Sequence, residues 1–137
     1  MPDIKSEYSR YRLERAKESL CVSRELEENG HYRDANNRAY YAVFHALRAV
    51  LALDGFDSKK HSGIIAEFRR LYIKTGIFSE EISNIIGEAF IIRNASDYDD
   101  MFIATKEDTL IQINNAEKLL NTIEQWLLNV YNSDYTS

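Results

Sequence analysis

The sequence has few of the residues that interrupt helices or cross-link chains. Its 137 residues include 1 Pro, 1 Cys and 5 Gly. The lone Cys21 cannot form an internal disulfide, which excludes a small disulfide-stapled scaffold. Pro2 is the single proline, so no helix interior is broken by that residue. Because 45% of the residues are hydrophobic, this composition also excludes collagen-like and disordered chains.

Long apolar runs are also absent. The most apolar stretch, residues 39–53, is 15 residues long and contains His45 and Arg48, whereas a membrane-spanning helix needs about 20 apolar residues. Residues 1–15 carry seven charges and no apolar core, unlike a signal peptide. We therefore expect a cytoplasmic protein that does not use a membrane as a partner.

Charge is net acidic and unevenly distributed. The 17 basic and 22 acidic residues give a net charge of −5, which counts against a generic nucleic-acid coat. Residues 31–74 nevertheless hold 8 basic and 4 acidic residues, whereas residues 75–137 hold 3 and 11. The basic segment is either an ordinary charged surface or a local strip that holds a phosphate chain.

Apolar residues recur at helical spacing along nearly the whole chain. The spacing predicts helices because apolar side chains three and four residues apart share one helix face. Gly30 and Gly76 are expected to end two of the helices, and Thr105 with Asp108 resembles a capping box that opens the last one. The predicted helices cover about residues 5–29, 32–53, 58–74, 79–94 and 105–131, with a polar interruption over 95–105.

These elements predict an all-α, up-and-down bundle of about five helices. We expect a single domain over residues 1–137, with a core of about 5–130. The helix over 32–53 has the widest apolar face and is expected to be central. The helix over 5–29 is expected to bury a stripe of Tyr8, Tyr11, Ala16, Leu20 and Leu26.

Several standard sites are missing. The sequence has no phosphate-binding P-loop, no dinucleotide-binding glycine motif and no zinc-protease motif. The three histidines, His31, His45 and His61, are 14 and 16 residues apart, which is not a local metal-ligand spacing. We therefore expect no metal site and no cofactor.

Arg93 breaks the pattern of its helix, because it lies at the edge of the face that should be buried. A buried unpaired charge costs several kcal/mol, so Arg93 needs an anionic partner. One interpretation is an arginine at a helix end, satisfied by the last carbonyls and by Asp97 or Asp99. The other is that Arg93 and Asn94 contact a phosphate or a scissile RNA linkage, which suits the planar guanidinium.

A second set of candidates lies earlier in the chain. Asn37, Tyr41 and His45 recur every four residues and so share one helix face. The pattern favours a core or interface histidine at His45, hydrogen-bonded to a neighbour, over a ligand-binding one. His61 follows two lysines near a helix start, where it either helps to bind an anion or caps the helix in solvent. The candidate ligand- or phosphate-binding residues are Arg38, His45, His61, Arg93 and Asp97.

Three segments resemble the HEPN domain, in its small stand-alone prokaryotic branch UPF0332. They are RAYYAVFHAL at 38–47, KHSG at 60–63 and RNASDY at 93–98. The resemblance spans about residues 5–130 and implies an up-and-down helical bundle. It also implies a homodimer that brings two Arg-containing segments together, and a minimal nucleotidyltransferase as partner in a toxin–antitoxin pair.

In ribonuclease members of this family, an Arg, a polar residue and a His a few residues later form a metal-independent site. A His there can move the ribose 2′-hydroxyl proton, and the Arg stabilises phosphate charge. Arg93 and Asn94 match the first two positions, but Tyr98, Asp99 and Asp100 stand where the His would fall. The catalytic candidates are Arg93, Asn94 and Tyr98, and the resemblance also makes Tyr98 a candidate for modification with AMP.

The residues and the resemblance leave two functions open. The first is a HEPN-type toxin–antitoxin component directed at RNA, either a ribonuclease or a protein that lost this activity with the motif His. The second is a non-catalytic, homodimeric module that binds a nucleotide or a protein partner. The retained Arg93 and Asn94 favour the first function, and the missing His favours the second.

Overall fold

Helices make up most of the chain. The structure, a computed structural model, describes residues 3–136, with side chains for 3–133. No strand occurs among residues 3–136, which confirms the predicted all-α class. The elements are α1 (Ile4–Glu28), α2 (Tyr32–Ala52), α3 (His61–Phe68), the π-helical turn η1 (Arg69–Ile73), α4 (Glu80–Tyr98) and α5 (Lys106–Thr136).

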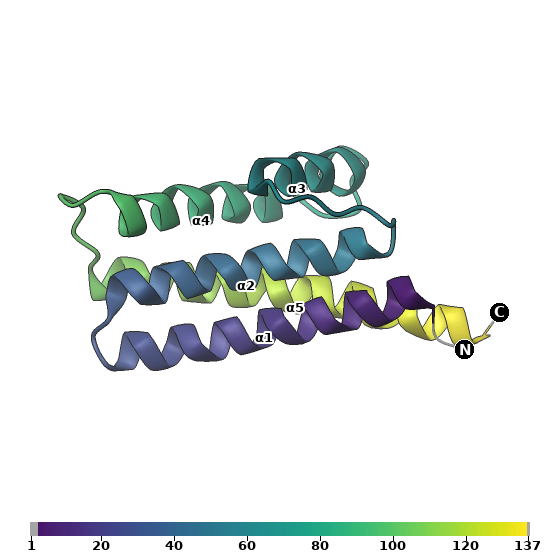
Figure 1. The fold of residues 1–137 in the computed structure, drawn as a ribbon, viewed down its shortest axis with the longest axis horizontal. Helices are drawn as coiled ribbons and strands as arrows, with labels where there is room; N and C mark the ends of the chain where they lie inside the picture. The colour runs from purple at the N-terminus through teal and green to yellow at the C-terminus, as the bar shows by residue number, and fades with distance from the viewer. Residues whose placement is uncertain (1–2, 137) are drawn as a thin grey trace.

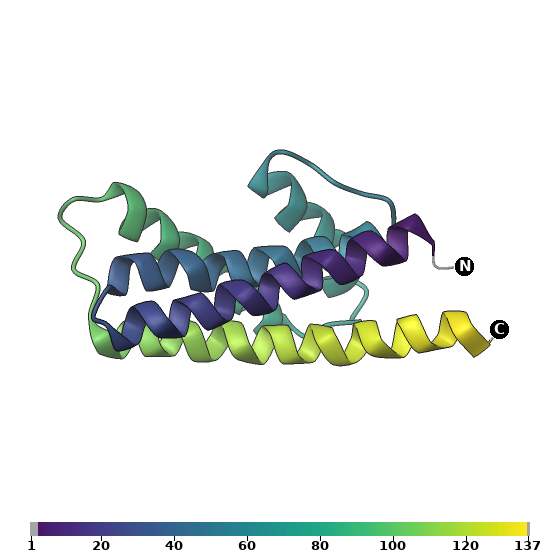
Figure 2. The same cartoon turned by 60° about the horizontal axis from the view of Figure 1, so that its bottom comes forward.

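The helices form an up-and-down bundle, as predicted. The four long helices, α1, α2, α4 and α5, alternate in direction along the chain (Figure 1). The α2 helix lies between α1 and α5 on one side and α3 and α4 on the other, and it contacts all four (Figure 2). No helix in the described part of the chain is long and apolar enough to cross a membrane.

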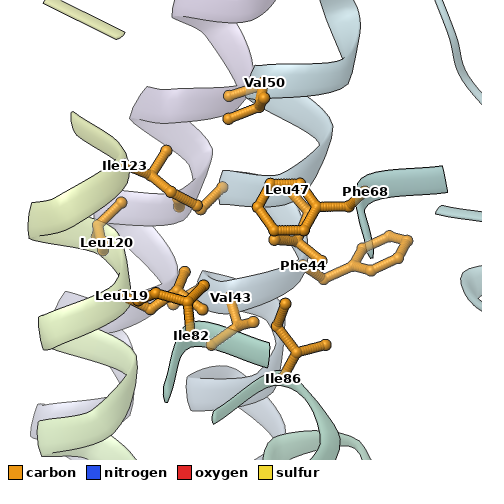
Figure 3. Close-up of a cluster of buried hydrophobic side chains, with 14 of the residues drawn as sticks. Val43, Phe44, Leu47, Val50, Phe68, Ile82, Ile86, Leu119, Leu120 and Ile123 are labelled. Carbon is orange, nitrogen blue, oxygen red and sulfur yellow. The ribbon is translucent and has the colours of Figure 1, made fainter. Parts of the chain in front are cut away.

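The α2 helix is the centre of the core, as its wide apolar face predicts. Fourteen of its 21 residues are buried. Figure 3 shows Val43, Leu47 and Val50 of α2 meeting side chains from α3, α4 and α5. Burying such side chains is the main source of stability in a bundle of this kind.

The buried face of α1 differs from the predicted one. Tyr11 is 50% exposed, so the expected tyrosine stripe does not face the core. Small polar residues lie there instead: Ser9 donates to the Ala49 carbonyl at 2.6 Å, and Ser23 donates to the Ala35 carbonyl at 2.7 Å. The prediction is confirmed for Ala16, which is fully buried, and for Leu20, which packs against the core. It was wrong for Tyr11, and it missed the serines because a serine hydroxyl can be buried once it has a hydrogen-bond partner.

The third helix is shorter than predicted. It begins at His61, not at 58, because the Ser58 side chain closes a turn by accepting from the Lys60 amide at 3.1 Å. The regular helix ends at Phe68 and continues as η1. Gly76, with φ +79, then allows the chain to turn toward α4.

The fourth helix is longer than predicted and runs through the segment expected to interrupt it. Two residues of α2 hold its last turn. Asn36 donates to Ser96 Oγ at 3.2 Å, and the Arg33 guanidinium donates to the carbonyls of Ser96 at 2.8 Å and Asp99 at 3.0 Å. These contacts come from a distant segment, so local sequence does not reveal them. Beyond the loop, the predicted Thr105 cap is confirmed, because its Oγ accepts from the Asp108 amide at 3.1 Å.

Candidate functional site

Arg93 lies inside α4 because this helix extends to Tyr98. Its Nε donates to Asp97 Oδ2 at 2.9 Å, an ion pair between successive helical turns. Its Nη2 donates to the Tyr41 hydroxyl at 3.3 Å, and only 14% of the Arg93 side chain is exposed. Arg93 thus has the anionic partner that the sequence analysis predicts, and this partner is Asp97.

Three tyrosine rings surround the Arg93 guanidinium. Its central carbon lies 5.3 Å from the centre of the Tyr40 ring and 5.5 Å from those of Tyr41 and Tyr98. A cation held over aromatic faces is stabilised by their negative potential. Tyr98 itself is 73% exposed, so this wall of the site is open to solvent.

Asp97 is held from two helices. Besides the ion pair with Arg93, its Oδ2 accepts from Asn37 Nδ2 of α2 at 2.8 Å. Asn94, the other polar residue of the segment, has only a long contact of 3.5 Å from Arg93 Nη1 to its Oδ1. The Asn94 side chain therefore has little holding it against Arg93.

His61 approaches the same tyrosine pair from the start of α3. Its Nδ1 shares a 2.8 Å hydrogen bond with the Tyr40 hydroxyl, and its ring stacks on Phe44 at 4.1 Å between centres. Burial lowers the pKa of His61, and the charges of Arg93 and Arg48 lower it further. His61 is consequently neutral near pH 7.

The structure does not bring His45 to Arg93. Its Nδ1 accepts from Arg12 Nη1 of α1 at 3.2 Å. Burial, followed by the charges of neighbouring arginines, lowers the pKa of His45 to about 4. A helix turns 100° per residue, so positions four apart drift around it, and His45 faces α1 while Asn37 faces α4.

The remaining candidate, Arg38, is exposed on α2 and makes no hydrogen bond or ion pair with residues 3–133. No three His, Cys, Asp or Glu side chains among the described residues are placed to hold a metal ion.

A pocket of about 530 Å³ opens beside His61. It contains residues that the sequence analysis did not select. Among them, Arg48 Nη2 donates to Asp57 Oδ2 at 2.7 Å, and Lys59 adds a second cation to the lining. The signal for Arg48 was its charge inside the most apolar stretch of the chain. The lining residues are Phe44, Arg48, Asp57, Ser58, Lys59 and His61.

A family model described as the HEPN domain matches residues 9–126. The chain belongs to the HEPN family. A UPF0332 protein of Thermotoga maritima is 34% identical over 115 residues, which cover 84% of this chain and 87% of that protein. "Putative toxin MJ0605" of Methanocaldococcus jannaschii is 35% identical over 84% of this chain and 85% of its own. "Putative toxin MJ0142" of the same organism is 31% identical over 85% and 79%.

The HEPN fold is also found in a solved structure. The crystal structure of ST0689, an archaeal HEPN homologue, superposes with a TM-score of 0.62 and 19% identity, covering 87% of this chain and 97% of that one. The resemblance of the three segments to HEPN is thus confirmed. In this HEPN chain the three segments converge, because Tyr40 contacts both His61 and Arg93.

Proposed function

We propose that this HEPN protein is the RNA-directed, toxin-like component of a toxin–antitoxin pair, with a metal-independent ribonuclease-type site centred on Arg93. Its family and its similarity to two M. jannaschii proteins with toxin in their names support the toxin-like role. The antitoxin partner that the family resemblance implies is a minimal nucleotidyltransferase.

The observation that carries the proposal is the way in which Arg93 is held. Asp97 takes its Nε at 2.9 Å, but the terminal nitrogens have only long contacts, 3.3 Å to Tyr41 and 3.5 Å to Asn94. Hydrogen bonds of that length are weak. The outer edge of the guanidinium is therefore available to a stronger acceptor, and two phosphate oxygens match its geometry.

A second candidate function is a non-catalytic module that binds a nucleotide or a protein partner. Tyr98 stands where ribonuclease members have a His, and Asp97 already neutralises Arg93. Tyr98 is 73% exposed, which makes its hydroxyl accessible to a partner enzyme. In this second function Tyr98 accepts AMP from the nucleotidyltransferase.

The proposed assembly is a homodimer joined near this site. Met101 and Ile103 follow Tyr98 in the loop after α4 and are 87% and 80% exposed. Neighbouring exposed apolar side chains are typical of interaction surfaces. A second copy placed there would bring two Arg93 side chains toward each other.

Cleavage of single-stranded RNA in the presence of EDTA tests the first function. We expect the wild-type protein to cleave, and Arg93→Ala to lose about 10²–10³-fold in rate because the phosphate charge loses its stabilising donor. Arg93→Lys should retain part of the activity, since it keeps the charge but not the fork. Arg70→Ala is the control, because Arg70 is exposed and pairs with Glu67 outside the site.

RNA binding and AMP transfer, measured on the same purified protein, distinguish the second function from the first. RNA bound without cleavage, together with AMP transfer to wild type but not to Tyr98→Phe by a nucleotidyltransferase with ATP and Mg²⁺, would favour the non-catalytic module. A wild-type protein that neither binds nor cleaves RNA would contradict the RNA-directed role.

A further inference from the structure

The Arg93 segment lacks the histidine of ribonuclease members, but the fold supplies one from elsewhere. The His61 ring centre lies 5.7 Å from that of Tyr40 and 5.8 Å from that of Tyr41. The Arg93 guanidinium lies 5.3 and 5.5 Å from the same two rings. A guanidinium and an imidazole therefore share one pair of tyrosines, and the charge of Arg93 acts on the pKa of His61.

The surroundings of His61 fix the ring and leave one nitrogen for chemistry. Its Nδ1 is occupied by the Tyr40 hydroxyl at 2.8 Å, and Phe44 stacks on its face at 4.1 Å. Its Nε2 has no hydrogen-bond partner among residues 3–133. An imidazole oriented through one nitrogen and open at the other is the usual arrangement of a proton-transfer histidine.

The pocket beside His61 has the composition of a nucleotide-binding site. His61 is partly exposed and supplies aromatic surface for a base, whereas Phe44 beneath it is only 3% exposed and supports the imidazole. Arg48 and Lys59 supply two cations against the single carboxylate of Asp57. Base stacking and phosphate attraction are the two main contributions to the binding of single-stranded nucleic acid. The pocket volume of about 530 Å³ lies within the range of small-ligand sites.

We propose that His61 replaces the missing motif histidine, so that Arg93, His61 and the adjoining pocket form one composite RNA-cleaving site. This inference rests on the proposed function and names the residue that moves the proton. The pocket with Arg48 and Lys59 holds the nucleotide next to the scissile phosphate. Arg93 contacts that phosphate from α4.

The reaction is a transesterification. His61 Nε2 takes the proton of the ribose 2′-hydroxyl, and O2′ forms a bond to the neighbouring phosphorus. The bond from phosphorus to the 5′-oxygen breaks, and that oxygen takes up a proton from solvent while the imidazolium returns its proton to solvent. The products are a 2′,3′-cyclic phosphate and a 5′-hydroxyl, and no metal or oxidant is consumed.

His61→Asn is the first test, because it removes proton transfer while keeping a planar, hydrogen-bonding side chain. We expect its cleavage rate in EDTA, measured at saturating RNA, to fall at least about 10²-fold, with the melting temperature nearly unchanged. Added imidazole should restore activity to His61→Ala but not to Arg93→Ala. His31→Asn, at an exposed histidine before α2, is the matched control.

The pH profile of cleavage distinguishes proton transfer by His61 from a purely structural role of this residue, which would not change the profile. In wild type, the acidic limb should report a group that titrates below 6.5, and this limb should disappear in His61→Asn. The titratable and charged groups near His61 are Tyr40, Tyr41, His45 and Arg48 of α2 and Arg93 of α4, with Asp57 and Lys59 on the preceding loop.

The possible outcomes separate the two proposals. If wild type cleaves and Arg93→Ala does not, but His61→Asn keeps the wild-type rate, the role of His61 is overturned and the proposed function stands. If wild type binds RNA without cleaving it, the role of His61 is overturned and an RNA-directed function remains. If wild type neither binds nor cleaves RNA, both proposals fail.

Discussion

His45 of α2 and His61 of α3 are both neutral near pH 7, and each is held by a different neighbour. His61 shares a hydrogen bond with the Tyr40 hydroxyl, whereas His45 accepts one from the Arg12 guanidinium. The Arg12 contact requires an unprotonated Nδ1 on His45 and so fixes its proton on Nε2. His45 therefore acts in the packing of α1 against α2, and His61 remains the histidine of the candidate site.

His45 should make the stability of the protein depend on pH. Burial and then the charges of Arg12, Arg15, Arg48 and His61 lower its pKa to about 4, from a usual 6.5. Between these pH values the unfolded chain binds a proton that the folded chain does not. The free energy of unfolding should therefore fall by up to about 3 kcal/mol as the pH falls from 6.5 to 4, and then level off.

His45→Asn isolates this effect, because the asparagine oxygen can still accept from Arg12. Urea denaturation at pH values from 7 to 4 should show a flatter acid limb in the variant than in wild type. His31→Asn, at the exposed histidine, should keep the wild-type slope. An unchanged slope in His45→Asn would show that this imidazole is not held neutral.

Arg33 of α2 contacts the backbone at the end of α4 at several points. Arg33 donates to the carbonyls of Ser96 and Asp99, and also to that of Phe102 in the loop. Helix C-termini leave four carbonyls without intrahelical partners, so a guanidinium placed there satisfies groups that would otherwise need water. The same contacts place the turn that carries Asp97 and Tyr98.

Arg33→Ala should loosen this end of the molecule more than it destabilises the core. We expect faster hydrogen exchange over residues 95–104 and a loss of about 1–3 kcal/mol in the free energy of unfolding. Arg38→Ala, an exposed arginine one and a half turns along α2, should change neither. Equal exchange rates in wild type and Arg33→Ala would contradict the capping role.

Substitution of a buried serine of α1 should lower the free energy of unfolding, even when the new side chain is apolar. Ser23 is fully buried and donates to the Ala35 carbonyl at 2.7 Å. Ser23→Ala should cost about 1 kcal/mol through the lost hydrogen bond. Ser23→Leu should cost about 1–3 kcal/mol or more, because the close contact with α2 has no room for a larger side chain.

Chemical denaturation measures both losses. Cys21→Leu is the matched control, since Cys21 is exposed on the same helix, and it should change stability by less than about 0.5 kcal/mol. A more stable Ser23→Leu variant would show that the α1–α2 contact is loosely packed.

These elements show what the sequence could predict and what it could not. Apolar spacing identified α2 as the centre and α5 as a long helix because such patterns are local. The buried serines of α1 were not predicted, because a serine is expected to be exposed unless its hydrogen-bond partner, here a carbonyl of α2, is known. The end of α4 was missed for a similar reason: Arg33 lies more than 60 residues from the carbonyls it caps.

The candidate site likewise has a part that the sequence could predict and a part that it could not. The segment of Arg93 and Asp97 could be predicted as a candidate site, because the apolar spacing of a single helix is enough to show that Arg93 lies on the buried face. The approach of His61 to Tyr40 depends on how α3 packs on α2, and the pocket of Arg48 and Asp57 depends on a loop path. Tertiary packing decides such contacts, so spacing along the chain does not reveal them.

At the scale of the whole molecule, the uneven charge is arranged by face. Lys17 and Arg24 of α1 pair with Glu124 and Glu117 of α5, which neutralises part of the acidic C-terminal half. The cations of Arg48 and Lys59 lie at the pocket beside His61. The net charge of −5 is therefore compatible with an RNA chain that approaches from the side of α2 and α3.

Two strongly exposed apolar side chains lie close together in one loop. Met101 and Ile103 lie in the loop between α4 and α5, at the opposite end from the start of α1 (Figure 1). If this loop joins two copies, the Met101→Lys and Ile103→Lys double variant should be monomeric, because a buried unpaired ammonium group is costly. Sedimentation over a range of protein concentrations measures the change.

Ile4→Lys provides the control for this experiment, because Ile4 is 81% exposed at the far end of the molecule. It should leave the dimer intact. Since the dimer would bring two Arg93 segments together, the monomeric double variant should also lose RNA cleavage while keeping its melting temperature. A wild-type monomer at micromolar concentration, or a double variant that still dimerises, would contradict an interface at this loop.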